Sequence, residues 1–236
     1  MKNILFDLDG TLLPMNQDKF VKAYFTLLAK KLIPLGYDPK TIAESVWKST
    51  FSMVKNDGSK TNEQVFWEDF SKTYGEKAIN DNSVFEDFYK NEFESLKDVC
   101  GFNPLVAKTV SFLKENNYKL IAATNPLFPK VATFARLRWA GVSPDDFELV
   151  TTYEDSTFCK PNPKYYNEIL QKLNLNPEEC LMVGNDVGED MVAKTLGINV
   201  FLLTDCLINK KGEDISVYPN GNFNDLIEYI KKDSEN

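Results

Sequence analysis

Apolar residues follow two different spacings along this chain, and each change of spacing marks an expected element. Short apolar runs bounded by turn residues predict buried strands, at residues 3–6, 119–123, 147–151, 180–183 and 199–203. Spacings of three and four predict helices between and after them, at residues 105–114, 129–139, 165–173, 189–196 and 223–230. Because strands and helices alternate here, the sequence predicts right-handed crossovers and a mainly parallel sheet.

A long helical stretch separates the first strand from the others. Its spacing predicts four helices, over residues 18–32 and 39–55, from Thr61 onward, and over 84–96. Thr61 and Gln64 have the spacing of a capping box. The fold class predicted is therefore α/β, a doubly wound Rossmann-like parallel-sheet core with an inserted all-helical cap domain. The core is assigned to residues 1–15 and 100–236, and the cap to residues 16–99.

Composition narrows the classes of protein further. The chain has 236 residues, of which 43% are hydrophobic, and a net charge of −8, which argues against a broad nucleic-acid-binding surface. Its apolar stretches are too short for a membrane span, and acidic residues follow Met1 closely, so neither a membrane partner nor a signal peptide is expected. Four widely spaced cysteines predict free thiols in a reducing cytoplasm. We expect a cytoplasmic protein, a monomer or a weak homo-oligomer.

The complete absence of histidine restricts the chemistry. It excludes Ser-His and Cys-His nucleophile pairs, histidine-ligated zinc and histidine general bases. Catalysis in this chain must therefore rely on carboxylates, lysine, hydroxyl groups, cysteine or a bound metal ion.

Polar side chains follow the predicted strands at the points where they end. Asp7 and Asp9 come directly after the first strand, and side chains at i and i+2 of an extended chain share a face. Two such anions repel one another unless a cation or a proton lies between them, and hard divalent cations prefer oxygen ligands. Further strand ends carry Thr124-Asn125 and Asn185-Asp186. The carboxyl ends of parallel strands converge on one crevice, so these residues are expected to become neighbours.

The order of these motifs resembles that of the haloacid dehalogenase superfamily, and specifically its phosphatases with a helical cap inserted after the first motif. Four segments carry the resemblance, namely Asp7-Leu8-Asp9-Gly10-Thr11, Ala122-Ala123-Thr124-Asn125, Lys160-Pro161 and Val183-Gly184-Asn185-Asp186-Val187-Gly188-Glu189-Asp190. Together they span nearly the whole chain. The combination is specific, whereas a single threonine or lysine of this kind carries little information.

The resemblance implies a catalytic role for four residues. Asp7 would attack phosphorus to form an aspartyl-phosphate, and Asp9 would act as general acid and then general base. Thr124 and Asn125 would bind the phosphoryl group, and Lys160 would offset the negative charge of the phosphate and Asp7. Mg²⁺ is the implied cofactor, held by Asp7, the backbone carbonyl of Asp9, and Asp186.

The fourth motif departs from the commonest family spelling, because Asn185 stands between its glycine and its first aspartate. One alignment makes Asp186 the metal ligand, with Asp190 supporting it. The other gives the ligand position to Asn185, and Asp190 itself is a further alternative ligand. A carboxylate binds Mg²⁺ better than a neutral amide, which favours Asp186.

The resemblance therefore predicts a Mg²⁺-dependent phosphatase acting on a small phosphorylated metabolite. Dehalogenation is disfavoured because it needs no acid at Asp9. A sugar-phosphate mutase of the β-phosphoglucomutase kind stays open, as does, outside the enzymes, a receiver-like or phosphate-binding regulatory protein. The substrate cannot be derived from the sequence, although five residues are candidates for contacting it, Lys19, Lys22, Trp47, Lys48 and Phe51. We expect Arg136 and Arg138 to be solvated.

Overall fold

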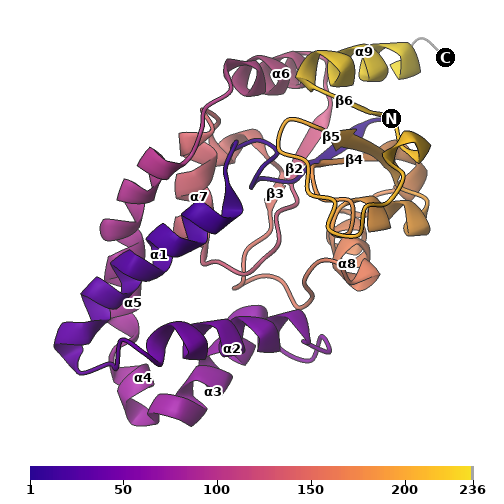
Figure 1. The fold of residues 1–236 in the computed structure, drawn as a ribbon. Helices are drawn as coiled ribbons and strands as arrows, with labels where there is room; N and C mark the ends of the chain where they lie inside the picture. The colour runs from indigo at the N-terminus through magenta and orange to yellow at the C-terminus, as the bar shows by residue number, and fades with distance from the viewer. Residues whose placement is uncertain (235–236) are drawn as a thin grey trace.

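The computed structural model describes residues 1–234, and within them six parallel strands form one sheet in the order β3-β2-β1-β4-β5-β6 (Figure 1). The strands are β1 Asn3–Phe6, β2 Lys119–Ala122, β3 Leu149–Val150, β4 Cys180–Gly184, β5 Asn199–Leu203 and β6 Asn220–Gly221. The direction of strand order reverses between β1 and β4, which is where open α/β sheets place their ligands. The predicted doubly wound α/β fold is confirmed.

Helices cover both faces of the sheet because successive strand residues point to opposite sides. Ile4 and Phe6 of β1 pack with helices α6 (Pro104–Glu115), α7 (Lys130–Trp139) and α9 (Phe223–Ser234). Leu5 packs on the other face with α8 (Pro163–Leu173) and the 3₁₀ helix η5 (Met191–Leu196). β1 is therefore buried on both sides, and its carboxyl end is fixed between its two neighbours.

A helical region lies to one side of the sheet (Figure 1). It consists of α1 (Gln17–Leu32), α2 (Ile42–Val54), α3 (Asn62–Tyr74), α4 (Glu76–Asn80), α5 (Asn82–Lys90) and the 3₁₀ helices η1 (Ile33–Leu35) and η2 (Glu92–Val99). The chain enters and leaves this region at one place, where the Gly101 N–H donates to Pro14 O at 2.6 Å and Met15 pairs with Cys100. The division into a core and a cap at residues 16 and 100 stays a prediction. The contact between the chain segments at residues 14–15 and 100–101 supports it.

One residue of α3 ties the helical region to the loops beyond the sheet. Asn62 is fully buried, and its backbone N–H donates to Ser156 O at 2.9 Å. Its side-chain amide donates to Pro126 O and Cys159 Sγ, both at 3.3 Å. The first residue of α3 is therefore hydrogen-bonded to residues 156–159, the segment that precedes Lys160.

Several details of the elements differ from the sequence-based expectation. The capping box of Thr61 and Gln64 is present, but the helix expected over residues 84–96 breaks at Asn91 into α5 and η2. The helix expected from residue 39 begins at Ile42, after a turn at residues 38–41. Residues 191–196 form a 3₁₀ helix, while α4 and β6 were not expected.

The four cysteines are free thiols, as expected. Within residues 1–234, no helix combines the length and the apolar character needed to span a bilayer.

Candidate active site

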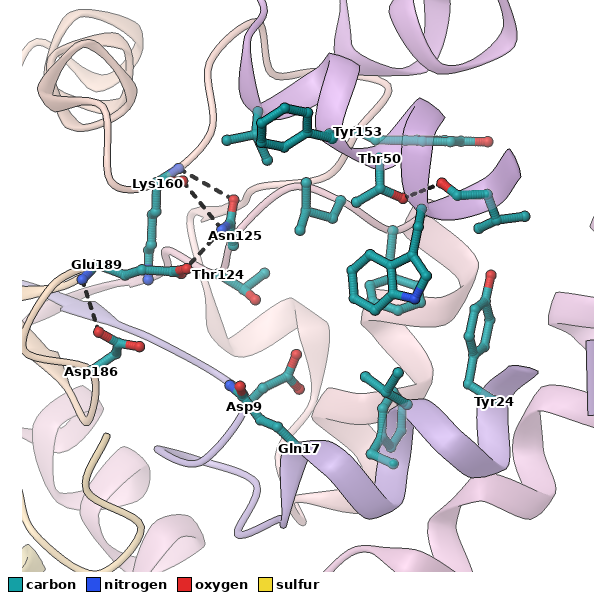
Figure 2. A pocket seen from close by; sticks show the side chains of 18 of the residues that line it. Asp9, Gln17, Tyr24, Thr50, Thr124, Asn125, Tyr153, Lys160, Asp186 and Glu189 are labelled. Carbon is teal, nitrogen blue, oxygen red and sulfur yellow. Dashed lines mark hydrogen bonds between the residues drawn. The ribbon is translucent and has the colours of Figure 1, made fainter. Parts of the chain in front are cut away.

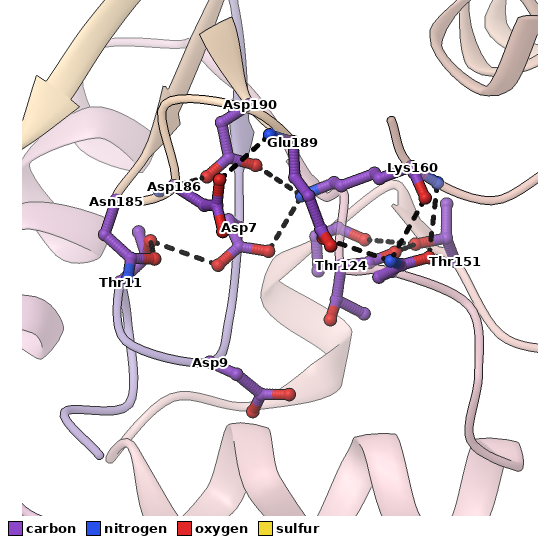
Figure 3. Close-up of polar contacts among 12 residues, drawn as sticks. Asp7, Asp9, Thr11, Thr124, Thr151, Lys160, Asn185, Asp186, Glu189 and Asp190 are labelled. Carbon is purple, nitrogen blue, oxygen red and sulfur yellow. Dashed lines mark hydrogen bonds and ion pairs between the residues drawn. The ribbon is translucent and has the colours of Figure 1, made fainter. Parts of the chain in front are cut away.

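Asp7 lies at the carboxyl end of β1, between the ends of the two neighbouring strands (Figure 3). Its backbone N–H donates to Val183 O of β4 at 2.9 Å, and Phe6 O accepts from the Ala123 N–H after β2 at 2.7 Å. These two ladders fix the position of Asp7 at the reversal of strand order. The residues that follow β2 and β4, including Thr124 and Asp186, are thereby brought to the same edge.

Lys160 is the centre of a buried charge network. Its Nζ lies 2.8 Å from Asp7 Oδ1 and 2.7 Å from Asp190 Oδ1, and its side chain is 0% exposed. Burial disfavours the charged form, but the carboxylates of Asp190 and Asp7 outweigh it and hold the pKa of Lys160 well above its ordinary value. The lysine is therefore an ammonium that joins the first motif to the fourth.

Asn125 holds the backbone of Lys160 in place. Its Oδ1 accepts from the Lys160 N–H at 3.2 Å, and its Nδ2 donates to Lys160 O at 3.5 Å and to Glu189 Oε2 at 3.0 Å. Its neighbour Thr124 is buried, and the Thr124 carbonyl accepts from Thr151 Oγ1 at 2.7 Å. The Thr124 side chain borders a cavity, as Figure 2 shows.

Asp190 and Asp186 form one hydrogen-bonded unit. Asp190 Oδ2 accepts from the Asp186 N–H at 2.9 Å, while Asp186 Oδ1 accepts from the backbone of Gly188 and Glu189. Burial raises the pKa of Asp190, and its ion pair with Lys160 opposes this. The bonds to Asp186 use Oδ1, so its other carboxylate oxygen has no partner in the described part of the chain.

Asn185 joins the loop after β4 to the loop after β1. Its Oδ1 accepts from Thr11 Oγ1 at 2.9 Å, and its Nδ2 donates to Cys206 O at 2.7 Å. Gly10 has φ +90°, and a Cβ there would collide with the Asn185 side chain. The amide of Asn185 is thus already engaged on both sides, and glycine is required opposite it.

Asp9 forms an ion pair that the sequence analysis did not anticipate. Arg136 was expected in solvent, but it is fully buried, and its Nη1 donates to Asp9 Oδ2. It also lies 4.5 Å from the centre of the Phe128 ring. Burial raises the pKa of Asp9 and Arg136 lowers it, while Asp9 Oδ1 is buried with no partner within residues 1–234. Arg138 is half exposed, as expected, and binds Glu94.

The burial of Arg136 could have been recognised from the helical spacing of α7. Ala132, Arg136 and Trp139 stand at i, i+4 and i+7, and all three are buried. The position therefore belongs to the face that meets the core, where an arginine requires a partner. Asp9 supplies that partner.

The acidic groups can accommodate Mg²⁺, although no three His, Cys, Asp or Glu side chains in the described residues converge as a ready-made metal site. Arg136 binds the Asp9 carboxylate, and Lys160 contacts the carboxylates of both Asp7 and Asp190. The candidate ligands are the carboxylates of Asp7 and Asp186 and the Asp9 carbonyl. Such a set fits Mg²⁺, which commonly uses one or two carboxylates and completes its shell with water and phosphate oxygens.

A cavity of about 420 Å³ extends from this polar cluster into the helical region (Figure 2). Asp7, Asp9, Thr124, Lys160 and Asp186 line one end of it. Of the candidate substrate contacts, Trp47 and Phe51 line the cavity, whereas Lys19, Lys22 and Lys48 do not. The site residues expected from the sequence are therefore brought together at one mouth.

Comparisons with known proteins agree with this geometry. A model of the haloacid dehalogenase-like hydrolase family matches residues 1–196. The chain is 26% identical over 206 residues to pyrophosphatase PpaX of Bacillus pumilus (strain SAFR-032), covering 84% of this chain and 83% of that protein.

Two solved structures are similar in fold. One is a predicted phosphoglycolate phosphatase from Haemophilus somnus 129PT, with TM-score 0.61, 19% identity and 98% of each chain covered. The other is β-phosphoglucomutase from Clostridium difficile, with TM-score 0.58, 16% identity, and 98% of this chain and 96% of that one covered. At these identities the structures establish the fold alone.

Proposed function

Because the chain belongs to the haloacid dehalogenase-like hydrolases, we propose that it is a Mg²⁺-dependent phosphatase that hydrolyses the phosphate monoester of a small metabolite. The observation that carries this proposal is the position of Lys160, whose ammonium contacts both Asp7 and Asp190 at the end of β1. A buried cation at that point favours the approach of a phosphate dianion to Asp7.

Asp7 is the proposed nucleophile. One of its oxygens attacks phosphorus, the bond to the ester oxygen breaks, and the phosphoryl group remains on Asp7 as an aspartyl-phosphate. Lys160 and Thr11 contact the two carboxylate oxygens and so restrict the orientation of the group. Water then attacks the same phosphorus, which releases inorganic phosphate and regenerates Asp7.

Asp9 is the proposed acid and base. It gives its proton to the departing alcohol oxygen and takes one from the attacking water. Burial raises its pKa, which favours the protonated form that the first step requires. Its unpartnered Oδ1 is available for this proton, because Arg136 occupies Oδ2.

Three residues are proposed to bind the phosphoryl group. Thr124 presents its side chain to the cavity beside Asp7, and Lys160 supplies the positive charge. Asn125 is proposed to act by holding Lys160 in place, because its side chain is hydrogen-bonded to the Lys160 backbone and to Glu189. Such positioning and charge neutralisation provide most of the rate of phosphoryl transfer.

Mg²⁺ would be held by the carboxylates of Asp7 and Asp186 and by the Asp9 carbonyl, where it would neutralise charge on the phosphoryl oxygens. Asp186 is favoured over Asn185 as the ligand since the amide of Asn185 is bonded to Thr11 and Cys206. Asp190 is proposed to support Asp186, whose backbone N–H donates to Asp190 Oδ2, rather than to bind the metal.

The helical region, residues 16–99, is proposed to act as a cap that limits the substrate to a small metabolite. The cavity between it and the catalytic end has the volume of an ordinary small-molecule site. A mutase would use the same catalytic residues and differ in excluding water from the phosphorylated Asp7. Release of inorganic phosphate distinguishes the two reactions.

Purified protein incubated with Mg²⁺ and 4-nitrophenyl phosphate is expected to release phosphate continuously. Asp7→Asn should abolish this, while Asp145→Asn, at an exposed position away from the site, should not. Phosphate from a labelled ester should be trapped on the peptide that contains Asp7 in the wild type and not in Asp7→Asn. Turnover by Asp7→Asn near the wild-type rate would show that the nucleophile is another group.

A further inference from the structure

The part of the cavity that the helical region lines has a predominantly aromatic wall. Residues of the helical region that line it are mostly aromatic or aliphatic, namely Phe20, Val21, Tyr24, Phe25, Val46, Trp47, Phe51, Val54, Phe66, Trp67, Phe85 and Tyr89. Leu127, Phe128 and Tyr153 continue this surface from the core. We call this set the aromatic wall. We propose that the alcohol part of the substrate is an uncharged group bearing an aromatic ring or a bulky hydrocarbon, held against the aromatic wall.

Three hydroxyl groups at the wall have partners within the protein, whereas Trp67 Nε1 is buried with none among the described residues. The hydroxyl groups of Tyr24 and Tyr89 are 2.9 Å apart. Thr50, which also lines the cavity, donates its hydroxyl to Val46 O at 2.8 Å within α2. These hydroxyls therefore do not require a polar ligand, and the wall offers apolar contact together with the N–H of Trp67.

The charges around the cavity disfavour a second anionic group on the substrate. Five carboxylates line it, from Asp7, Asp9, Asp186, Glu189 and Asp190, against two ammonium groups, Lys160 and Lys210. Lys160 is already bound to Asp7 and Asp190. Arg136 likewise pairs with Asp9, so the cations nearest the catalytic carboxylates are already engaged, and an added carboxylate or phosphate would be poorly compensated.

The helical region supplies no cation to the cavity. Among the described residues that line it, none from 16–99 is Lys or Arg. Several lysines of this region are paired elsewhere with carboxylates, as Lys31 is with Asp87 and Lys60 with Glu68. Lys55 Nζ lies 4.3 Å from the centre of the Phe51 ring but stands outside the lining. An anionic leaving group would thus find no cation on the wall.

This inference rests on the proposed function, because the phosphoryl group must bind beside Asp7 for the alcohol to reach the wall. It separates this chain from the activities named for its relatives. Pyrophosphate and phosphoglycolate each carry a second anionic group, whereas an ester such as 2-phenylethyl phosphate carries a ring in its place. Phosphoglycolate and 2-phenylethyl phosphate are both primary alkyl esters. Comparing them therefore tests recognition of the alcohol part more than leaving-group chemistry.

The test measures kcat/KM by phosphate release from the full chain with Mg²⁺. We expect 2-phenylethyl phosphate to exceed both phosphoglycolate and pyrophosphate by at least about tenfold. 4-Nitrophenyl phosphate serves as a general reporter of turnover. Equal or better use of either anionic compound, with the reporter turned over, would overturn the inference and leave the proposed function standing. No phosphate release from any of the four compounds would overturn both.

A pair of variants tests the wall directly. Thr50→Lys introduces a cation into the lining, and we expect it to shift the ratio of kcat/KM values toward phosphoglycolate by about tenfold, the size of one partly buried ion pair. Ser52→Lys adds the same charge to the same helix outside the lining and should leave the ratio unchanged. Identical ratios in the two variants would contradict the role assigned to the wall.

Discussion

The Asp9 carboxylate and the Arg136 guanidinium form an ion pair beside the catalytic cavity, with the arginine side chain 1% exposed and the aspartate side chain 23% exposed. The two residues are far apart in sequence, and the ring of Phe128 covers the guanidinium. Because Arg136 binds Oδ2, the carboxylate of Asp9 is held with Oδ1 unpartnered among the residues that the structure describes. Arg136 is thus a candidate positioning residue for the acid.

Arg136→Met should impair the acid step more than binding. We expect kcat for 2-phenylethyl phosphate to fall about a hundredfold, since an alkoxide is a poor leaving group without a proton. For 4-nitrophenyl phosphate, whose leaving group needs little protonation, the fall should be less than about tenfold. Arg136→Lys, which keeps the charge, should recover part of the loss. Steady-state rates with the two esters give the measurement.

The control for this prediction is Arg138→Met, at the half-exposed position on the same helix. It should leave both rates close to wild type. If Arg136→Met lowered the two esters by the same factor with the melting temperature unchanged, the affected step would be the one they share, the attack of water on phosphorylated Asp7, and not the departure of the alcohol. Thermal melting of each variant monitors the support of the fold separately.

The choice between Asp186 and Asn185 as metal ligand can be decided by two substitutions. Asp186→Asn should raise the Mg²⁺ concentration needed for half-maximal activity by at least about 10- to 100-fold, because a carboxylate oxygen is lost. Asn185→Ala should leave that concentration unchanged and instead lower the free energy of unfolding by about 1–3 kcal/mol, since Thr11 and the Cys206 carbonyl lose a partner. The reverse pattern would assign the ligand to Asn185.

Metal removal provides the companion experiment. Chelation should abolish phosphate release by the wild type, and excess Mg²⁺ should restore it, because the charge on the phosphoryl oxygens would then lack the cation that neutralises it. Activity that persists at the same rate after exhaustive chelation would refute the metal requirement.

Much of the sheet could be predicted from the sequence because its central strands are buried on both faces. Continuous apolar runs such as residues 4–6 and 180–183 are typical of strands buried on both faces of a parallel sheet. β6 contains only Asn220 and Gly221, so no apolar pattern marks it. The break at Asn91 was equally hidden, since the helical spacing of aromatic residues continues across it from Tyr89 to Phe93, four residues later.

The residues of the candidate site could likewise be predicted where a buried strand positions them. Residues at strand ends, such as Asp7 and Thr124, could be placed because parallel strands end at one edge. The spacing along α7 could place Arg136 on the core-facing side of the helix but could not identify its partner, because that partner depends on how α7 packs beside the loop after β1. The engagement of Asn185 with Thr11 depends on tertiary structure in the same way.

Asn62 should control how firmly the helical region is attached to the core. Asn62→Ala removes the bonds to Pro126 O and Cys159 and leaves Asn56 Nδ2 without its bond to Asn62. We expect the free energy of unfolding to fall by about 1–3 kcal/mol and KM for the ester to rise more than kcat falls. Asn80→Ala, at an exposed position of α4, is the matched control. A change confined to kcat would place the effect of Asn62 in the chemical step instead.

Gly10 and Gly36 provide a comparison in which backbone strain is held constant. Their φ angles are +90° and +86°, so an alanine at either position carries the same left-handed penalty of about 1–2 kcal/mol. A Cβ at Gly36 meets open space, whereas one at Gly10 meets the Asn185 side chain. Gly10→Ala should therefore lower the free energy of unfolding further than Gly36→Ala and abolish activity, because Thr11 and Asp7 shift with the loop. Urea unfolding and phosphate release measure the two effects. Equal losses of stability with activity retained would mean that the loop after β1 can move away from Asn185 without disturbing Asp7.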